Sequence, residues 1–386
     1  MTLSPNLYRF QTAPQIVAGP GSLGQLGAHL DLAGSFRSAL VVAQRSMVRQ
    51  GFADEVVRQL EQKEISCSII QDVMPEPTAG HIRELCARLS EESFDLIVGI
   101  GGGSVLDVTK LISVLRTNDR QVEEMLGIDN VERPGIPAVL IPSTAGTGSE
   151  VTPNAIVTLP EEELKIGVVS RHLLPRLVVL DPCLTMELPQ AHTAATGMDA
   201  FTHAIESYIS VKANPISDMF ALESIRLISR NIVQVYREGS DLAAREQMLL
   251  GSMYGGMALT GSGTAAVHAL AYPLGGKFNI PHGVANSMLL PHVMEFNESA
   301  VRGRLKRVAV AMGLGGSLQN AEGVIQKIKE WTVALDIPQD LRVFGVEGRN
   351  VPALAQAALK VTRLMQNNPK PMAAGDVEAV YRKLLP

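Results

Sequence analysis

A strand that runs directly into three glycines and then into a helix constrains this chain more than any other feature. The run DLIVGI at Asp95–Ile100 is typical of a buried strand, Gly101, Gly102 and Gly103 follow at once, and Ser104–Leu115 has helical spacing. Glycines let the backbone approach a phosphate closely, and the next helix offers free N–H groups and a positive dipole end. We expect a phosphate-binding loop here. A turn that only permits tight packing is the alternative, since Ser104 takes the place of the third glycine of GxGxxG.

The rest of the first half repeats this alternation of short β-branched runs with amphipathic segments. Phe52–Gln62 has the spacing of an amphipathic helix. The runs expected to form strands are Ser38–Ala43, Cys67–Ile70, Ile136–Ile141, Ala155–Thr158, Ile166–Val169 and Leu177–Leu180. Strands that alternate with helices form parallel sheets covered by those helices. We therefore predict an α/β domain over residues 1–188.

The pattern changes from Pro189 onward to long helical segments with few β-branched runs. Apolar residues keep helical spacing between Ile216 and Ile232, and again between Leu354 and Leu364. A chain of 386 residues exceeds the size at which one hydrophobic core stops growing. We predict a second, all-helical domain over residues 189–386 that packs directly against the first.

A second loop rich in hydroxyl groups and glycine follows the strand expected at Ile136–Ile141. It reads STAGTGSE from Ser143 to Glu150, and Thr144 and Thr147 are able to donate to a phosphate or to a nicotinamide amide. A plain turn is the alternative. Ser149 as a nucleophile is disfavoured, because GTGSEV lacks the GxSxG elbow of hydrolases.

Two potential metal ligands lie one helical turn apart in the second half. Asp199 and His203 are four residues apart in a segment with helical spacing, so their side chains leave the same face. With His268 and His282 they would form a site of three imidazoles and one carboxylate, which suits a divalent transition metal. Alternatively, Thr196 and Asp199 fit a helix N-cap box, and any single histidine is more often structural than a ligand.

Composition excludes several classes of protein. A net charge of −5 without a basic run argues against nucleic acid as a partner. No apolar run approaches the length of a membrane span, and the N-terminus lacks the regions of a secretory signal, so we expect a cytoplasmic protein. The three cysteines include no CxxC pair, which argues against both a disulfide framework and a thiolate zinc site.

Taken together, the motifs in this chain resemble those of the iron-containing (group III) alcohol dehydrogenase family, over essentially the full length. The resemblance is carried by GGGSVLDVTK at Gly101–Lys110, TAGTGSEVT at Thr144–Thr152, ATGMDAFTHAIE at Ala195–Glu206, VHALAYPLGG at Val267–Gly276, PHG at Pro281–Gly283 and NNPKP at Asn367–Pro371. It implies a Rossmann-like domain that binds NAD or NADP and a dehydroquinate synthase-like helical domain that binds a metal. The active site would lie in the cleft between them.

The resemblance also assigns roles to individual residues. Metal ligands would be Asp199, His203, His268 and His282. Glu206, one turn beyond His203, would either orient that ring as an acceptor or occupy a solvated helix position. Cofactor contacts would come from Gln44, Gly101, Gly102, Gly103, Ser104, Asp107, Ser143, Thr144, Thr147 and Lys165. Fe²⁺ is favoured from the resemblance alone, since Zn²⁺ and Mn²⁺ accept the same ligands. A homodimer is the expectation from the family.

Two positions depart from the family pattern. Gln44 takes the place of an aspartate that often binds the adenosine ribose, and Arg45 follows it, so the preference between NAD and NADP stays open. Tyr272 takes the place of a second histidine four residues after His268, so a histidine proton relay is unavailable there. Tyr272 is instead a candidate hydrogen-bond donor in the pocket.

The expected reaction is hydride transfer between a nicotinamide C4 and the carbon of a small alcohol, diol or aldehyde, with a metal that polarises the oxygen. Candidate substrate contacts are Asn154, Tyr254, Leu259 and Tyr272, whereas His192, His292 and Trp331 are assigned to structure. The alternatives are a reductase with other chemistry, similar to maleylacetate reductase or glycerol dehydrogenase, and a catalytically silent cofactor-binding protein.

Overall fold

A six-stranded parallel sheet forms the centre of the N-terminal half. The computed structural model describes residues 7–162 and 164–386. The sheet has the strand order β1-β9-β6-β4-β2-β3. Its strands are β1 (Ile16–Ala18), β2 (Ser38–Ala43), β3 (Ser66–Ile70), β4 (Leu96–Gly101), β6 (Ala138–Pro142) and β9 (Leu177–Leu180). The predicted strands at these positions are confirmed to within two residues, while β1 was not predicted.

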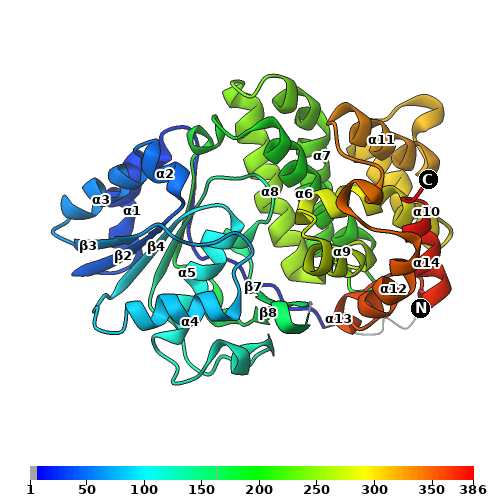
Figure 1. The fold of residues 1–386 in the computed structure, drawn as a ribbon. Coiled ribbons are helices and arrows are strands. Elements are labelled where there is room, and N and C mark those ends of the chain that lie inside the picture. Colours follow the sequence, from blue (N-terminus) through cyan, green and yellow to red (C-terminus); the bar gives the residue numbers. More distant parts are fainter. Residues whose placement is uncertain (1–6, 163) are drawn as a thin grey trace.

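Alternate residues of each strand pack against different helices. On β2, Leu40 and Val42 belong to the core that holds α4 and α5, whereas Val41 belongs to the core that holds α1 and α3. Figure 1 shows these two pairs of helices on opposite sides of the sheet. The covering helices are α1 (Leu26–Ala33), α2 (Arg45–Arg49), α3 (Phe52–Glu61), α4 (Ala79–Arg88) and α5 (Gly103–Leu115). Both faces are therefore buried, which explains why the strands are nearly continuous apolar runs.

The connections change direction between β2 and β4. From β2 the chain goes outward to the edge strand β3, then returns to form β4 on the other side of β2. In open α/β sheets, ligands bind beyond the carboxyl ends of the strands at such a switch point. Gln44 follows β2, and the glycine triplet begins with the last residue of β4, so both lie at this position.

The runs expected near Ala155 and Ile166 form strands, but not in the main sheet. They are β7 (Asn154–Leu159) and β8 (Leu164–Val169), which pair antiparallel and form a second sheet with β5 (Gly127–Ile128). The expectation that they continue the parallel sheet was wrong. Two adjacent strands joined by a short connection pair most easily with each other, and here that local pairing prevails.

The C-terminal half is a bundle of helices built around α6. Its helices are α6 (Gln190–Ile209), α7 (Pro215–Arg237), α8 (Leu242–Ser262), α9 (Ala266–Phe278), α10 (His282–Ala311), α11 (Ala321–Ala334), α12 (Val351–Leu359), α13 (Thr362–Met365) and α14 (Ala374–Arg382). The α/β and all-helical fold classes are thus confirmed. The spacing from Leu354 to Leu364 continues across a break, because α12 ends before Val361 and α13 begins after it. None of the helices in the described part of the chain is long and apolar enough to cross a membrane.

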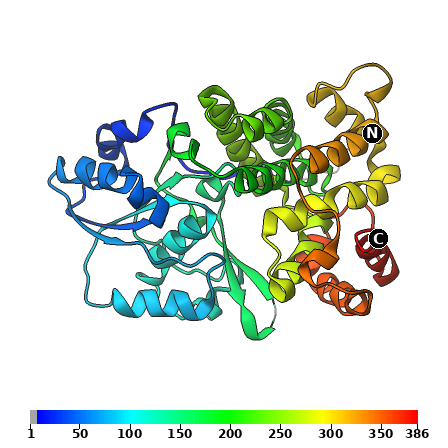
Figure 2. The same ribbon diagram turned by 45° about the horizontal axis from the view of Figure 1, so that its top comes forward.

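The two halves pack closely along the start of the bundle (Figure 2). Val178 and Leu180 of β9 belong to the same hydrophobic core as α6. Gly148 has a positive φ of 60°, and a Cβ added there would lie 2.6 Å from the Cα of Gly256 on α8. The hydroxyl-rich loop therefore touches the helical domain backbone to backbone, which only glycine permits. Trp331 is buried edge-on against Phe201, as its structural assignment predicts.

Candidate metal and cofactor site

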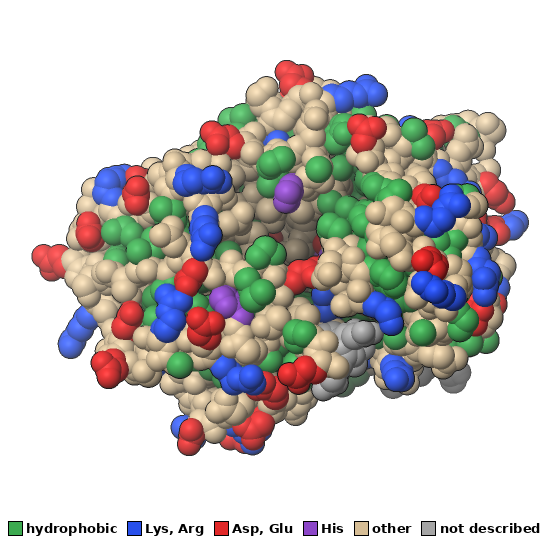
Figure 3. Space-filling model, in the orientation of Figure 1, with side chains coloured by type: hydrophobic (Ala, Val, Ile, Leu, Met, Phe, Trp, Pro, Cys, Tyr) green, Lys and Arg blue, Asp and Glu red, His purple; other side chains and the backbone are tan. Residues whose placement is uncertain are grey.

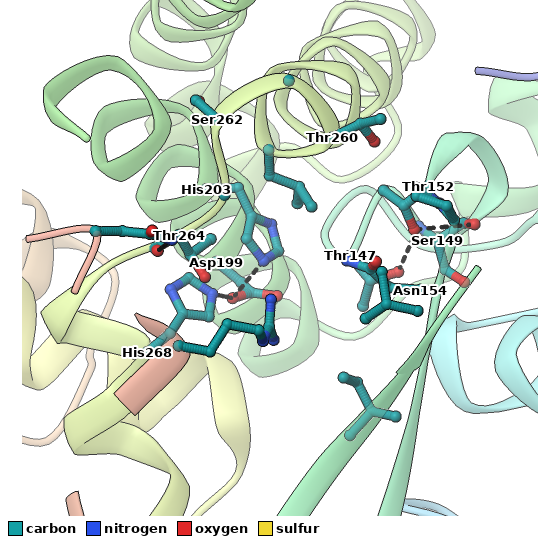
Figure 4. A pocket seen from close by; sticks show the side chains of 18 of the residues that line it. Thr147, Ser149, Thr152, Asn154, Asp199, His203, Thr260, Ser262, Thr264 and His268 are labelled. Carbon is teal, nitrogen blue, oxygen red and sulfur yellow. Dashed lines mark hydrogen bonds and ion pairs between the residues drawn. The ribbon is translucent and has the colours of Figure 1, made fainter. Parts of the chain in front are cut away.

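The aspartate and the three histidines predicted as metal ligands come together at one place. The Nε2 atoms of His268 and His282 both lie 3.7 Å from Oδ1 of Asp199, and Nε2 of His203 lies 3.8 Å from the same oxygen. The ligand atoms of Asp199, His268 and His282 all lie within 4.8 Å of one another, as a metal site requires. Figure 4 shows Asp199, His203 and His268 pointing toward one another at the cavity wall.

Three helices supply these side chains. Asp199 and His203 lie one turn apart in the middle of α6, while His268 and His282 lie in the first turns of α9 and α10. Thr196 is inside α6, where its hydroxyl donates to the carbonyl of His192. The alternative of an N-cap at Thr196 was therefore wrong, because the helix begins at Gln190.

Two of the imidazoles have a fixed orientation. Nδ1 of His203 lies 3.2 Å from the carbonyl oxygen of Gly146, which can only accept, so Nδ1 carries the proton. Nδ1 of His268 lies 2.6 Å from the Glu206 carboxylate. Both arrangements leave the Nε2 lone pair free toward Asp199, as in metal sites whose histidines donate from the other nitrogen. Glu206 was considered either an acceptor for His203 or a solvated position; it is instead fully buried and holds His268, because it points from α6 to the start of α9.

Glu206 also receives two backbone hydrogen bonds. The N–H groups of Ala265 and Val267 donate to its carboxylate at 3.0 and 2.6 Å. These donors precede and begin α9, so one buried carboxylate fixes both the helix start and the His268 ring. A pattern of glutamate three residues after His203 was visible in the sequence, but its partner 62 residues away was not.

Asn286 completes the environment of the ligands. Its side-chain nitrogen donates to Asp199 Oδ1 at 2.7 Å and lies 3.2–3.3 Å from Nε2 of His268 and of His282. Its Oδ1 is buried without a hydrogen-bond partner among the described residues. Sequence analysis missed Asn286, although it follows His282 by one helical turn on α10.

The electrostatics of this cluster favour a divalent cation. Burial lowers the pKa of His203 and lowers that of His282 to about 3, so both rings are neutral and able to ligate. Burial alone would raise the pKa of Asp199, but the three imidazoles and Asn286 hold it below its usual value. Within residues 7–162 and 164–386, neither Asp199 nor Glu206 forms an ion pair with a lysine or arginine. Two buried carboxylates without a cationic side chain fit a bound metal.

The ligands open into a cavity of about 350 Å³ between the two domains. The surface is hollowed where the domains meet (Figure 3). Asn154, Leu259 and Tyr272 line the cavity as expected, and the Tyr272 ring lies 5.9 Å from that of His282. Tyr254 does not line it, since its ring stacks near Phe220. Across the cavity from the ligands lie Thr147, Ser149 and Asn154 of the α/β domain (Figure 4).

The glycine loop lies where a phosphate-binding loop is expected. Gly102 is the N-cap residue of α5, and no side chain among the described residues caps this helix end, so its first N–H groups are available; the N–H of Gly102 donates to Gln44 Oε1 at 2.8 Å. A Cβ added to Gly103 would lie 2.6 Å from Cγ2 of Thr147. Gln44 and Thr147 thus pack on the loop itself. The Ser104 hydroxyl accepts a hydrogen bond from the N–H of Glu76, so this side chain has a structural contact.

Another carboxylate, the partly buried Asp107, holds the hydroxyl-rich loop. It accepts from the hydroxyl of Ser149 at 2.5 Å and from the N–H of Ile156 at 2.9 Å. Lys110, one turn further along α5, lies 3.6 Å from Asp107 and donates to the carbonyls of Ser149, Thr152 and Asn154. The Ser149 hydroxyl is therefore a structural donor to Asp107.

The remaining cofactor candidates are distributed around this loop. Ser143 is buried and bonded through its N–H to Gly101, and Thr144 packs against Gly102. Lys165 forms a 2.6 Å ion pair with Glu76 and lies close to Gly275 of α9 rather than in the wall of the cavity. A separate groove at the ends of β2 and β3 is lined by Arg45, Arg49, Ile69, Ile70, Gln71, Asp72 and Arg88.

The chain is similar in sequence to proteins of one known family. Residues 13–182 match the family model described as iron-containing alcohol dehydrogenase, and residues 193–385 match that of the C-terminal part of the Fe-containing alcohol dehydrogenase family. The chain is 38% identical over 383 residues to long-chain-alcohol dehydrogenase 1 of Geobacillus thermodenitrificans, covering 97% of this chain and 96% of the relative. It is 37% identical to 1,3-propanediol dehydrogenase of Klebsiella pneumoniae, covering 95% of each.

Solved structures give the same result. A crystal structure of 1,3-propanediol oxidoreductase matches with a TM-score of 0.93 at 36% identity, covering 98% of this chain and 100% of the other. An alcohol dehydrogenase from Oenococcus oeni matches with a TM-score of 0.92 at 30% identity, over 98% and 100% of the two chains. The chain therefore belongs to the iron-containing alcohol dehydrogenase family, whose members are oxidoreductases acting on CH–OH groups.

Proposed function

We propose that this protein is a metal-dependent, NAD(P)-linked dehydrogenase that interconverts a small alcohol or diol with its aldehyde. The observation that carries this proposal is the convergence of Asp199, His203, His268 and His282 on a cavity whose opposite wall belongs to the phosphate-binding domain. When bound, the metal supplies Lewis-acid polarisation of the substrate oxygen and the nicotinamide supplies or accepts the hydride. The intact donor set distinguishes this proposal from a metal-free reductase of similar fold.

The chain's own residues would hold the cation in a defined orientation. Asp199, His203, His268 and His282 are the proposed ligands, with Glu206 and Gly146 fixing two of the rings. Nitrogen and oxygen donors of this type accept Fe²⁺, Zn²⁺ and Mn²⁺, and we favour Fe²⁺ from family membership. Gly146 belongs to the hydroxyl-rich loop, so the position of one ligand depends on the domain that binds the cofactor.

The dinucleotide would lie across the switch point of the sheet. Its pyrophosphate would meet the free N–H groups at the start of α5, beside Gly102 and Gly103, and its nicotinamide end would reach Thr147 in the cavity. Gln44 and Arg45 replace an excluding carboxylate, and Arg45 lies with Arg49 in the groove at the end of β3. We therefore propose that NADP is accepted as well as NAD.

Tyr272 would act on the substrate rather than on the metal. Burial raises the pKa of its phenol, so the hydroxyl stays protonated at neutral pH and is available as a donor. With its ring close to that of His282, it would orient a substrate oxygen or a neighbouring hydroxyl. The cytoplasmic location, the homodimer and the domain boundary at Leu188 stay predictions.

The proposal is tested by the His268→Ala variant. Removing one imidazole should abolish bound metal and reduce NAD(P)H-dependent aldehyde reduction by at least about 10⁴-fold, while the Kd for NAD(P)H changes less than about threefold. Metal content by elemental analysis, turnover with a panel of aldehydes and cofactor binding by fluorescence measure the three quantities. His192→Ala, at an exposed position on the same domain, is the control. Full activity in a protein without detectable metal would refute the proposal.

A further inference from the structure

Two cationic side chains line the catalytic cavity without a partner. Arg363 lies on α13 and Lys212 lies in the connection between α6 and α7, and both contribute to the wall that also holds Asp199, His268 and Tyr272. Within the described ranges 7–162 and 164–386, neither head group forms an ion pair, a hydrogen bond or a cation–π contact.

The two segments that carry these cations are fixed to one another. The N–H of Val211 donates to the carbonyl of Asn367 at 3.0 Å, and the Asn367 amide donates to the carbonyl of Thr264 at 2.8 Å. Asn367 and Thr264 also line the cavity. The segments that carry Arg363 and Lys212 are therefore held together by hydrogen bonds, and they form one part of the cavity wall.

Among the described residues of the cavity wall, no acid is free to neutralise them. The carboxylates in its wall are Asp199, which faces three imidazoles, and Asp107, which holds Ser149 and Ile156. Arg363 is only partly exposed, so leaving its guanidinium without a counter-charge has a cost that a bound anion would remove. The wall of the cavity also has apolar residues, which are Ile128, Ile156, Val169 and Leu259.

We propose that the preferred substrate of this site carries an anionic group, a carboxylate for instance, at the end of its chain away from the reacting carbon. This inference rests on the proposed dehydrogenase function and names its substrate class: short ω-oxo or ω-hydroxy acids. Arg363 would hold the carboxylate with two parallel N–H donors, Lys212 would add charge at the cavity mouth, and the carbon chain would pack on the apolar wall. Arg363 is thus a specificity-determining residue.

A phosphate of the cofactor is the other anion that Arg363 would be able to bind. Arg363 lines the cavity together with Tyr272 and the metal ligands His268 and His282. Tyr272 adjoins the metal ligands on the helical domain, whereas the glycine loop lies on the α/β domain. The position of Arg363 therefore favours the substrate.

The test compares two aldehydes of equal chain length, 4-oxobutanoate and butanal. The wild type should reduce 4-oxobutanoate with a kcat/KM at least tenfold higher than butanal, and Arg363→Leu should lower that ratio by 10- to 100-fold. Arg363→Lys should recover part of it, and Lys212→Met should lower it less than tenfold because this side chain is solvated and screened. Arg382→Leu, an exposed arginine on α14, is the matched control.

Binding supplies a second readout that does not need turnover. Titration calorimetry with 4-hydroxybutanoate should show binding to the wild type that weakens at least tenfold in Arg363→Leu. A ratio near one in the wild type, or a ratio unchanged by Arg363→Leu, would overturn the inference. So would an Arg363→Leu effect confined to the KM for NAD(P)H with both aldehydes, since that outcome assigns Arg363 to the cofactor. Failure with both aldehydes, with Arg363-dependent binding retained, would instead contradict the proposed function.

Discussion

Two carboxylates, the fully buried Glu206 and the partly buried Asp107, organise the two sides of the cavity in the same way but differ in where their counter-charge comes from. Glu206 on α6 accepts from two backbone N–H groups and from His268. Asp107 on α5 accepts from the backbone of Ile156 and from the hydroxyl of Ser149. Lys110 lies one helical turn from Asp107 and forms an ion pair with it. Glu206 and Asp199 each contact an imidazole instead of a lysine.

We call the surroundings of Asp107 the Asp107 corner and those of Glu206 the Glu206 corner. The Asp107 corner has a structural role, whereas the Glu206 corner belongs to the proposed metal site. Lys110 is fully buried and donates to three backbone carbonyls, and its positive charge neutralises that of Asp107 from within the chain. The Glu206 corner leaves its positive charge to be supplied from outside, which is what a metal site needs. We therefore expect loss of the internal cation to affect folding, and changes at Glu206 to affect metal affinity.

The largest expected effect follows from removing the internal cation. Lys110→Met should lower the free energy of unfolding by about 3–5 kcal/mol, because Asp107 and the three carbonyls lose their buried donor. Urea unfolding in the presence of a chelator measures this without any contribution from metal. Lys327→Met, in an exposed pair with Glu330, should change stability by less than about 1 kcal/mol.

In the same assay, metal should stabilise the wild type only through mass action. The gain should grow with metal concentration and vanish with the chelator, unlike the contribution of Lys110. If the Lys110→Met protein were as stable as the Lys327→Met protein, the Asp107 corner would not depend on its internal lysine. The distinction from the metal-dependent Glu206 corner would then be contradicted.

The next effect in size concerns Glu206→Gln. A glutamine retains the shape but offers one acceptor oxygen for three donors, so the His268 ring loses its fixed orientation. Metal affinity should fall 10- to 100-fold, measured by competition with a chelating dye. The Kd for NAD(P)H should stay within about twofold, since that site lies on the other domain. Glu223→Gln, at an exposed position on α7, is the control, and equal metal affinities in the two variants would show that Glu206 does not position the ligand.

The parts of this comparison that sequence could predict are the local ones. Asp199 and His203 were placed on one face by helical spacing, and the glycine loop by the strand before it and the helix after it. The contacts that orient the ligands join residues far apart in sequence, such as His203 to Gly146 and His268 to Glu206, so no local pattern encodes them. The same limit explains the antiparallel pairing of β7 with β8, because each run alone resembles its parallel neighbours.

The smallest expected effect concerns pH and sharpens the view of the Asp107 corner. Glu150 is buried beside Lys110, and its Oε1 has no hydrogen-bond partner among the described residues; burial raises its pKa from 4.5 to about 7. The folded state thus binds this proton more tightly than the unfolded state, so the contribution to stability is present below pH 4.5 and is lost as pH rises through about 7. Between pH 5 and 8 the wild type should lose about 2 kcal/mol of unfolding free energy relative to Glu150→Gln, a figure set by the size of the pKa shift.

Urea unfolding of both proteins at each pH measures this difference, with Glu322→Gln, an exposed position on α11, as the control. Parallel pH profiles for the wild type and Glu150→Gln would show that Lys110 keeps both acids of this corner ionised, and the Asp107 corner would then carry a net negative charge as the Glu206 corner does.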